Sequence, residues 1–208
     1  MPDFSFEEAA WADGLSIVAG VDEAGRGPWA GPVVAGAAIL DPATLPVDLA
    51  GRLDDSKKLS AAKRDELFEQ IMIHCEAAIG IASVAEIDEI NILQATFLAM
   101  TRAVSALSRA PDLALVDGNR PPKLSCPVKC VVRGDSKSLS IAAASIVAKV
   151  SRDRMMAKLA DQYPGYGWER NKGYGTKEHK SALESLGVTD HHRKSYAPII
   201  KILSPGAI

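Results

Sequence analysis

Short β-prone runs alternate with long helical patterns along this chain, and that order limits the fold more than any other feature. The β-prone runs cover residues 17–21, 33–40, 78–84, 113–116 and 128–132. Apolar residues recur at helical spacing over 61–75, 86–107 and 140–160, and a turn-rich tail with shorter helical pieces begins near residue 163. A Gly- and Pro-rich connection between the first two runs predicts a hairpin. We therefore expect an α/β fold with a mixed sheet.

The composition is that of an ordinary globular protein. Of the 208 residues, 47% are hydrophobic and 24% charged, which excludes wholesale disorder, collagen and coiled coil. No apolar run approaches the roughly 20 residues of a membrane-spanning helix. The first residues are acidic where a signal peptide would be basic, and Cys75, Cys126 and Cys130 form an odd set. We expect one domain over 1–208, no membrane partner, a cytoplasmic location and cysteines with structural roles.

Charge is segregated along the chain although the formal net charge is only −2. Residues 120–180 contain 13 Lys and Arg against 5 Asp and Glu, a balance of +8, and the remainder has a balance of −10. A polyanion responds to the local field, so this segment suits a nucleic-acid partner. A solvated charged face explains the same charge equally well.

Four acids sit where β-prone runs end. Asp22 and Glu23 follow the first run, Asp117 the fourth and Asp135 the fifth. Ligands of open α/β sheets bind outside the carboxyl ends of the strands, so we expect these acids to converge. Clustered carboxylates repel one another unless a cation neutralises them, and oxygen ligands without Cys or His favour Mg²⁺ or Mn²⁺. For any one of these acids alone, a turn or a helix cap remains the alternative.

The loop after the first pair of acids suits close approach by a ligand. Gly25 and Gly27 flank Arg26, so backbone N–H groups can turn toward a sugar or phosphate while the guanidinium adds charge. A tight hairpin loop is the alternative reading of this triplet.

These residues belong to a series of motifs that resembles ribonuclease HII. The motifs follow the family's order over about residues 17–197, and Trp29 departs from the smaller aliphatic residue usual at its position. They are VDEAGRG at 21–27, DSKKL at 55–59, DEINI at 88–92, VDG at 116–118, GDSK at 134–137, AAASIVAK at 142–149 with Arg152-Asp153, and GYGTKEH at 173–179.

The resemblance implies a fold, a reaction and a set of site residues. The fold is of the ribonuclease H type, a mixed five-stranded sheet flanked by helices, with a helical extension from about residue 163 that completes the substrate site. The reaction is hydrolysis on the 5′ side of a ribonucleotide in RNA/DNA hybrids or in DNA duplexes with embedded ribonucleotides. It leaves 5′-phosphate and 3′-hydroxyl ends and uses two Mg²⁺ or Mn²⁺ ions. By position, Asp22, Glu23, Asp117 and Asp135 match the metal ligands, Gly25, Arg26 and Gly27 the sensor of the 2′-hydroxyl, and Tyr174 a ring that stacks on the next sugar.

Basic residues are candidates for contacts with phosphates. Lys57 and Lys149 lie within matching motifs, and the others are Lys137, Arg152, Arg170, Lys172 and Lys177. Asp153 is a possible partner for a neighbouring base. For His179, proton transfer near the leaving group and an exposed loop position are both open, and His74, His191 and His192 have no supporting motif.

Two other functions remain open at this point. One is a metal-dependent nuclease of the same fold that ignores the 2′-hydroxyl, and the other is a hybrid-binding module without turnover. Only 21 residues precede Asp22, so we expect no room for the N-terminal domain of the sibling ribonuclease HIII. Residues 198–208 lack a Gln-start, aromatic-pair pattern, so we expect no clamp partner, and we expect a monomer.

Overall fold

The computed structural model describes residues 1–204 and contains one five-stranded sheet with the order β3-β2-β1-β4-β5. β1 pairs antiparallel with β2, β2 pairs antiparallel with β3, and β1, β4 and β5 run parallel. The strands are β1 (Val18–Ala24), β2 (Val33–Ile39), β3 (Glu76–Ala82), β4 (Leu113–Asp117) and β5 (Val128–Val131). The predicted mixed sheet and its opening hairpin are confirmed. The stretch 198–208, where we expect no clamp motif, is described only to residue 204.

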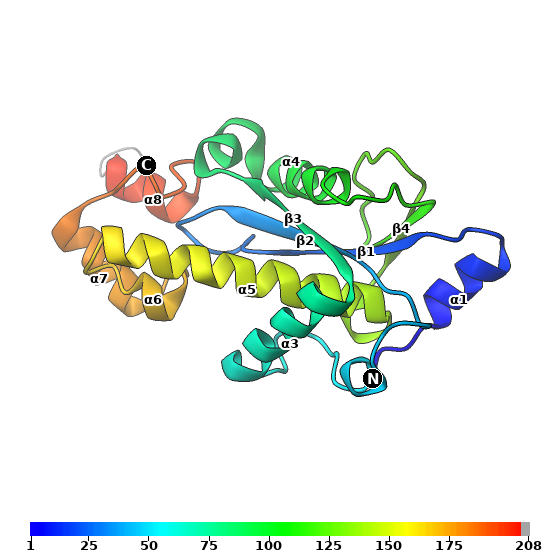
Figure 1. Cartoon of the computed structure of the whole chain (residues 1–208). Coiled ribbons are helices and arrows are strands. Elements are labelled where there is room, and N and C mark those ends of the chain that lie inside the picture. Colours follow the sequence, from blue (N-terminus) through cyan, green and yellow to red (C-terminus); the bar gives the residue numbers. More distant parts are fainter. Residues whose placement is uncertain (205–208) are drawn as a thin grey trace.

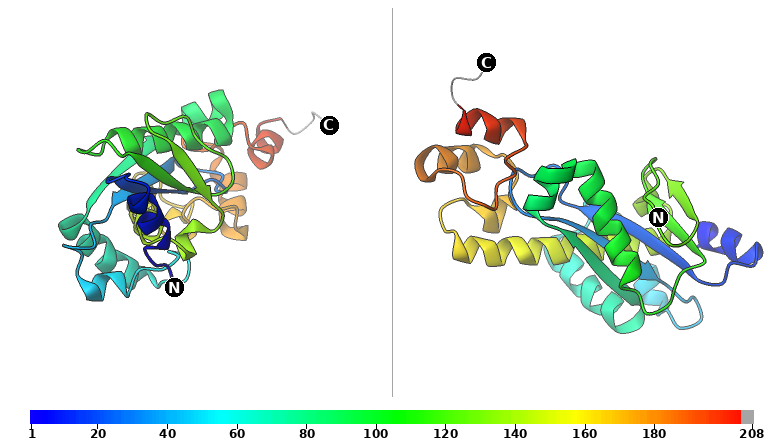
Figure 2. Two further views of the ribbon diagram at one scale, coloured as in Figure 1. Left: turned by 90° about the vertical axis from the view of Figure 1, so that its right-hand side faces the viewer. Right: turned by 90° about the horizontal axis from the view of Figure 1, so that it is seen from above.

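Helices cover both faces of the sheet (Figure 1). α3 (Ala61–His74) and α5 (Leu139–Gln162) pack on one face, and α4 (Val84–Ser105) packs on the other. The C-terminal helices α6 (Trp168–Asn171), α7 (Lys177–Leu186) and α8 (Ala197–Leu203) gather at one end of the molecule, and α1 (Ser5–Ala12) lies at the other (Figure 2). A short helix α2 (Val47–Ala50) and a 3₁₀ helix η1 (Gly134–Ser136) complete the described elements.

α5 lies unusually close to the central strands because both sides of the contact are small. A Cβ built on Gly36 of β2 would lie 2.3 Å from the carbonyl oxygen of Ala144. Ala142, Ala143 and Ala144 are fully buried in this contact. Any larger side chain at residue 36 would have to push α5 off the sheet. The Ala-rich first half of the predicted helix is thus explained by this packing.

Several boundaries differ from the sequence prediction for local reasons. β1 continues through Ala24, so Asp22 and Glu23 lie within the strand rather than after it, with Asp22 paired to Gly36. β3 ends at Ala82, because Ser83 and Glu86 form a capping box that starts α4. α4 is also kinked at Asn91, whose φ is 67° and whose side-chain oxygen accepts the backbone N–H groups of Leu93 and Gln94. The prediction of one regular helix over 86–107 is therefore wrong at this point.

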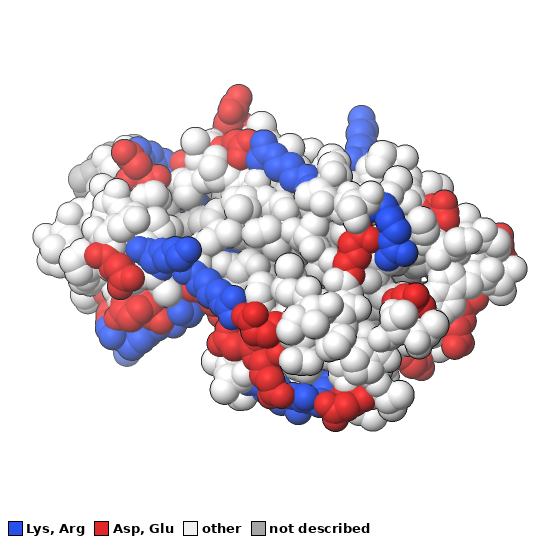
Figure 3. Space-filling model, viewed as in Figure 1, with Lys and Arg blue, Asp and Glu red and all other residues white. Residues whose placement is uncertain are grey.

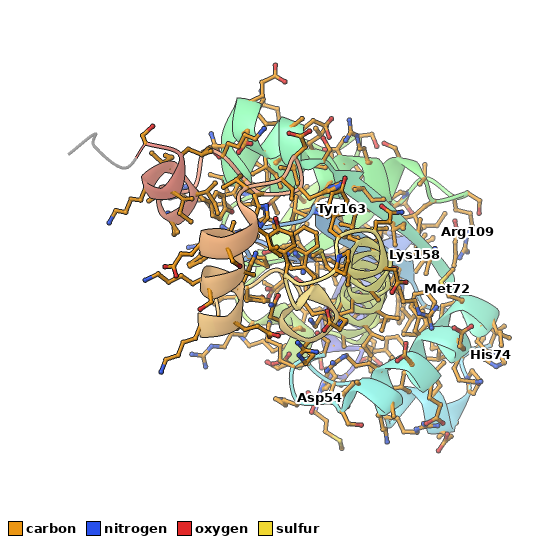
Figure 4. The ribbon with its side chains drawn as sticks, turned by 90° about the vertical axis from the view of Figure 1, so that its left-hand side faces the viewer. Asp54, Met72, His74, Arg109, Lys158 and Tyr163 are labelled. Carbon is orange, nitrogen blue, oxygen red and sulfur yellow. The ribbon has the colours of Figure 1, made fainter. Side chains whose placement is uncertain are left out.

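The residues after 163 pack as a helical extension on the end of α5. Met156 and Ala160 of α5 share a core with Trp168, Leu183 and Ile199 of the extension. Tyr163, which follows α5 and is labelled in Figure 4, packs on the rings of Trp168 and His191. Within residues 1–204, no helix combines the length and the apolar character needed to cross a bilayer.

Candidate functional site

The four acids predicted from strand ends lie at one edge of the sheet. Asp22 and Glu23 belong to β1, Asp117 is the last residue of β4, and Asp135 lies in η1 after β5. Because β1, β4 and β5 are adjacent and parallel, their carboxyl ends open on the same side. Asp117 accepts the backbone N–H of Gly134 at 2.6 Å, which ties the end of β4 to η1. Three remote segments thus deliver carboxylates to one place.

Too little positive charge surrounds these carboxylates to balance their negative charge. Burial, followed by repulsion from Glu23 and Asp117, raises the pKa of Asp22 well above its usual value. Burial also raises the pKa of Glu23, against the opposing effect of Arg26, which pairs with it at 3.2 Å. At Asp135, burial and then repulsion from Asp55 and Asp117 raise the pKa. A site of this kind favours binding of a cation.

Lys57 supplies part of the missing charge. Its ammonium lies 3.7 Å from Asp135 and 4.0 Å from Asp55. Burial opposes the charged form of Lys57, but attraction to Asp22, Asp55 and Asp135 dominates and raises its pKa. The side chain is 77% exposed, so the ammonium is also accessible to a phosphate group of a ligand in the site.

A cavity of about 430 Å³ joins most of the predicted residues. Asp135 is next to this cavity, because it forms an ion pair with Lys57, which lines it. The predicted residues that line the cavity are Asp22, Glu23, Gly25, Arg26, Gly27, Lys57, Asp117, Lys149, Arg152 and Tyr174. Tyr174 comes from the C-terminal extension and lies against the loop, since a Cβ on Gly27 would be 3.4 Å from its ring. The extension therefore forms one wall of the cavity.

Two buried arginines hold the Gly25–Gly27 loop in shape. Arg193 donates to the carbonyl oxygens of Gly25, Arg26, Gly31 and Pro32. Arg152 donates to those of Ala30, Pro32 and Lys172. Burial lowers the pKa of Arg152 to about 10. For Arg152, predicted as a phosphate contact, the structure favours a structural role, because the residue is 1% exposed and each of its three guanidinium nitrogens donates to a backbone carbonyl.

Gly25 is required where this loop meets Arg152. Its φ is +98°, and a Cβ there would lie 2.0 Å from the Nε atom of Arg152. Both the backbone conformation and the space thus select glycine at this position.

We expect Arg193→Lys to lower the free energy of unfolding by about 3 kcal/mol, because a lysine cannot satisfy the forked set of buried carbonyls. Urea denaturation of the two proteins measures the change. Arg154→Lys is the matched control, since Arg154 forms exposed ion pairs with Asp65 and Glu69. Its expected change is below about 0.5 kcal/mol. Equal losses in the two variants would contradict this role of Arg193.

Several basic side chains of residues 120–180 form ion pairs with acids in the folded protein. Lys149 pairs with Asp153 at 2.8 Å, as proposed for that aspartate, and Arg170 pairs with Glu178. Arg154 pairs with two acids from α3. On the face seen in Figure 3, basic side chains lie beside acidic ones rather than forming one continuous field. Asp153 and Glu178 are already counted in the balance of +8, whereas the two acids from α3 lie outside residues 120–180 and neutralise part of that positive charge.

His179 is neither an exposed loop residue nor close enough to the acids to line their cavity. It is fully buried in the first turn of α7, next to an equally buried His192. Sequence reasoning gave His192 no role and did not consider Arg193. Both lie outside the motifs, in a segment whose neighbours in space come from more than 100 residues earlier.

The acids fit a divalent cation by their chemistry. Within the described part of the chain, no three Asp, Glu, His or Cys side chains lie close enough to form a ready-made metal cage. The donors are nevertheless all carboxylates, and the raised pKa values of Asp22, Glu23 and Asp135 reflect unmet demand for positive charge. Hard oxygen donors of this kind suit Mg²⁺ or Mn²⁺.

Comparisons with known proteins agree on one family. A family model described as Ribonuclease HII matches residues 19–199. The chain is 61% identical over 203 residues to a ribonuclease HII from Paramagnetospirillum magneticum, covering 98% of this chain and 99% of the relative. It is 60% identical over 210 residues to one from Rhodospirillum rubrum, covering 100% and 94%. The crystal structure of ribonuclease H2 from Pyrococcus horikoshii superposes with a TM-score of 0.78 at 30% identity, covering 91% and 98%.

Proposed function

Because this chain belongs to the ribonuclease HII family and is thus a ribonuclease of the ribonuclease H type, we propose that it cuts the phosphodiester on the 5′ side of a ribonucleotide. The substrates are RNA/DNA hybrids and DNA duplexes with embedded ribonucleotides, and the products carry 5′-phosphate and 3′-hydroxyl ends. One observation carries the proposal: carboxylates from β1, β4 and η1 meet beside the glycine-flanked Arg26 and Tyr174. The enzyme acts as a cytoplasmic monomer in replication and repair.

Asp22, Glu23, Asp117 and Asp135 would hold two divalent cations, Mg²⁺ or Mn²⁺, which when bound activate the attacking water and stabilise the leaving 3′ oxygen. The protein's own part is to fix the positions of these carboxylates. The contact between Asp117 and the N–H of Gly134 does so for the segment that carries Asp135.

The remaining residues select and orient the substrate. The backbone of Gly25 and Gly27 can approach the 2′-hydroxyl without an intervening side chain, and Arg26 adds a fixed charge. Tyr174, which is 47% exposed, presents its ring for stacking on the next sugar. Lys57 and Lys149 meet the flanking phosphates. A polar site built around a hydroxyl rejects a substrate that lacks it, because its own groups would remain unpaired.

The test compares a DNA duplex containing one ribonucleotide with an all-DNA duplex of the same sequence, in Mg²⁺, Mn²⁺ or EDTA. We expect metal-dependent cutting of the first, with the second cut at least roughly 10³-fold more slowly. Product ends are identified by ligation and by phosphatase treatment. Equal cutting of both duplexes would point to a nuclease that ignores the 2′-hydroxyl. Binding without cutting in either metal would point to a binding module.

A further inference from the structure

Two neutral histidines lie buried behind the wall of the cavity that Tyr174 forms. His179 and His192 are each fully buried, and their Nε2 atoms are 3.0 Å apart. Trp168 donates its indole N–H to the Nε2 atom of His179 at 3.1 Å. Every ring nitrogen of the pair has a partner, so the partners fix where the protons lie.

An indole nitrogen can only donate, so Nε2 of His179 carries no proton. Nδ1 of His179 must then carry the proton, which agrees with its 3.0 Å contact to the carbonyl oxygen of Tyr174. Nδ1 of His192 accepts the backbone N–H of Thr189 at 2.9 Å. Because Nδ1 of His192 is an acceptor, its Nε2 carries the proton and donates to Nε2 of His179, whose one lone pair is shared by this N–H and the indole N–H of Trp168. The hydrogen bonds run in one direction, from Thr189 through His192 and His179 to Tyr174.

The end of this chain of hydrogen bonds holds the backbone of Tyr174. The tyrosine carbonyl accepts from His179 and from the N–H of Thr176 at 2.8 Å. Among the hydrogen bonds of residues 1–204, none restrains the phenol oxygen of Tyr174, so its ring is aimed through the backbone. The indole of Trp29 packs on the other side of this turn, since a Cβ on Gly175 would lie 2.1 Å from it.

We infer that His179 is a positioning residue for Tyr174, and that His192 and Trp168 hold it in the Nδ1–H tautomer that this task requires. The inference rests on the proposed role of Tyr174 in binding the sugar next to the ribonucleotide. His179 does not act in proton transfer, because both of its ring nitrogens are engaged within the core. Loss of the contact would loosen the ring over Gly27 and weaken substrate binding more than turnover.

Two substitutions at the same residue separate positioning from packing. The amide of His179→Asn can take the place of Nδ1 and still donate to Tyr174, whereas His179→Gln places its amide near Nε2 and loses that contact. With the duplex carrying one ribonucleotide, we expect the Gln variant to raise KM about 5-fold with little change in kcat. The Asn variant should remain within about 2-fold of the unaltered protein. Equal KM values in the two variants would overturn the inference.

A double-mutant cycle tells this inference apart from the proposed function. If His179 acts through Tyr174, His179→Gln has no further effect once Tyr174→Ala is present. The same 5-fold loss in both backgrounds would overturn positioning while leaving the function intact. A Tyr174→Ala protein with unchanged KM would instead contradict the proposed role of Tyr174. His74→Gln is the control with unchanged kinetics, because His74 is exposed at the outer end of α3 (Figure 4).

Nitrogen NMR tests the tautomers without any variant or substrate. In protein carrying ¹⁵N-labelled histidine, we expect His179 to show a protonated Nδ1 and His192 a protonated Nε2. The opposite tautomer at His179 would overturn the inference, because its Nδ1 would then have no proton to donate to Tyr174. This measurement remains decisive even if a variant at residue 179 fails to fold.

Discussion

Asp22→Asn is expected to remove metal-dependent cleavage and at the same time to make the metal-free protein more stable. Activity should fall at least roughly 10³-fold, because a cation site that supplies several kcal/mol of transition-state stabilisation loses a charged ligand. The amide oxygen of Asn can keep the hydrogen bond that Asp22 accepts from the N–H of Glu23 at 2.7 Å. The fold therefore has no reason to change.

The gain in stability follows from the pKa of Asp22. Burial and the neighbouring acids raise that pKa in the folded protein, so the carboxylate destabilises the fold increasingly as pH rises through the folded pKa. Removing its charge should add about 1 to 3 kcal/mol at pH 8, and the gain should shrink as pH falls. Urea denaturation in EDTA at several pH values measures this. Added Mn²⁺ should then stabilise the unaltered protein more than the variant.

Asp161→Asn removes a carboxylate from an exposed position on α5, and we expect both activity and stability to stay near those of the unaltered protein. If Asp22→Asn destabilised the metal-free protein, Asp22 would not be under electrostatic strain. Near-normal cleavage by this variant would mean that the metal ligands are wrongly assigned.

The sequence was sufficient to predict the sheet and the position of the acids at one of its edges. Asp117 and Asp135 each follow a short apolar run, and parallel strands in one sheet bring such ends together. At the acidic edge the extent of β1 was wrong, because the hairpin with β2 continues to Ala24 and places Asp22 inside the strand. Alternation of apolar runs contains no signal for where a hairpin stops pairing.

The supporting residues could not be predicted in the same way. Arg193 serves carbonyls more than 160 residues earlier, and Arg152 serves the same loop from the middle of α5. In sequence they look like surface charges. Their role depends on which backbone segment lies opposite, and only the folded chain shows that. Asn91 is similar, since its side chain satisfies the backbone of α4 at a kink that the apolar spacing does not reveal.

The case of His179 shows a further limit of prediction from sequence motifs. Its motif was visible, but the motif says nothing about burial, and both alternatives assumed contact with solvent or substrate. The partner that decides its chemistry is His192, 13 residues later and without a motif of its own. The three-dimensional structure is therefore needed to find this buried histidine pair. Its effect on the protein can be measured as a pH dependence of the free energy of unfolding.

His192 is expected to make the protein strongly sensitive to acid. Burial, followed by repulsion from His179, lowers the pKa of His192 in the folded protein to about 4. An unfolded chain has a histidine pKa of about 6.5, so between these values the unfolded state binds a proton that the folded state does not. The contribution of His192 is fully present above about pH 6.5 and is lost as pH falls toward 4, a change of about 3 kcal/mol.

The variant His192→Gln isolates this effect, because an amide does not titrate. The raised pKa values of Asp22, Glu23 and Asp135 act in the opposite direction, stabilising the fold as pH falls, but these acids are common to both proteins and cancel in the difference. Urea denaturation in EDTA from pH 7.5 to 4.5 should therefore show the unaltered protein losing its advantage over His192→Gln steadily below pH 6.5. A difference independent of pH would mean that His192 accepts a proton in the folded protein as readily as in the unfolded chain, and the directed hydrogen bonds to Tyr174 would lose their physical basis.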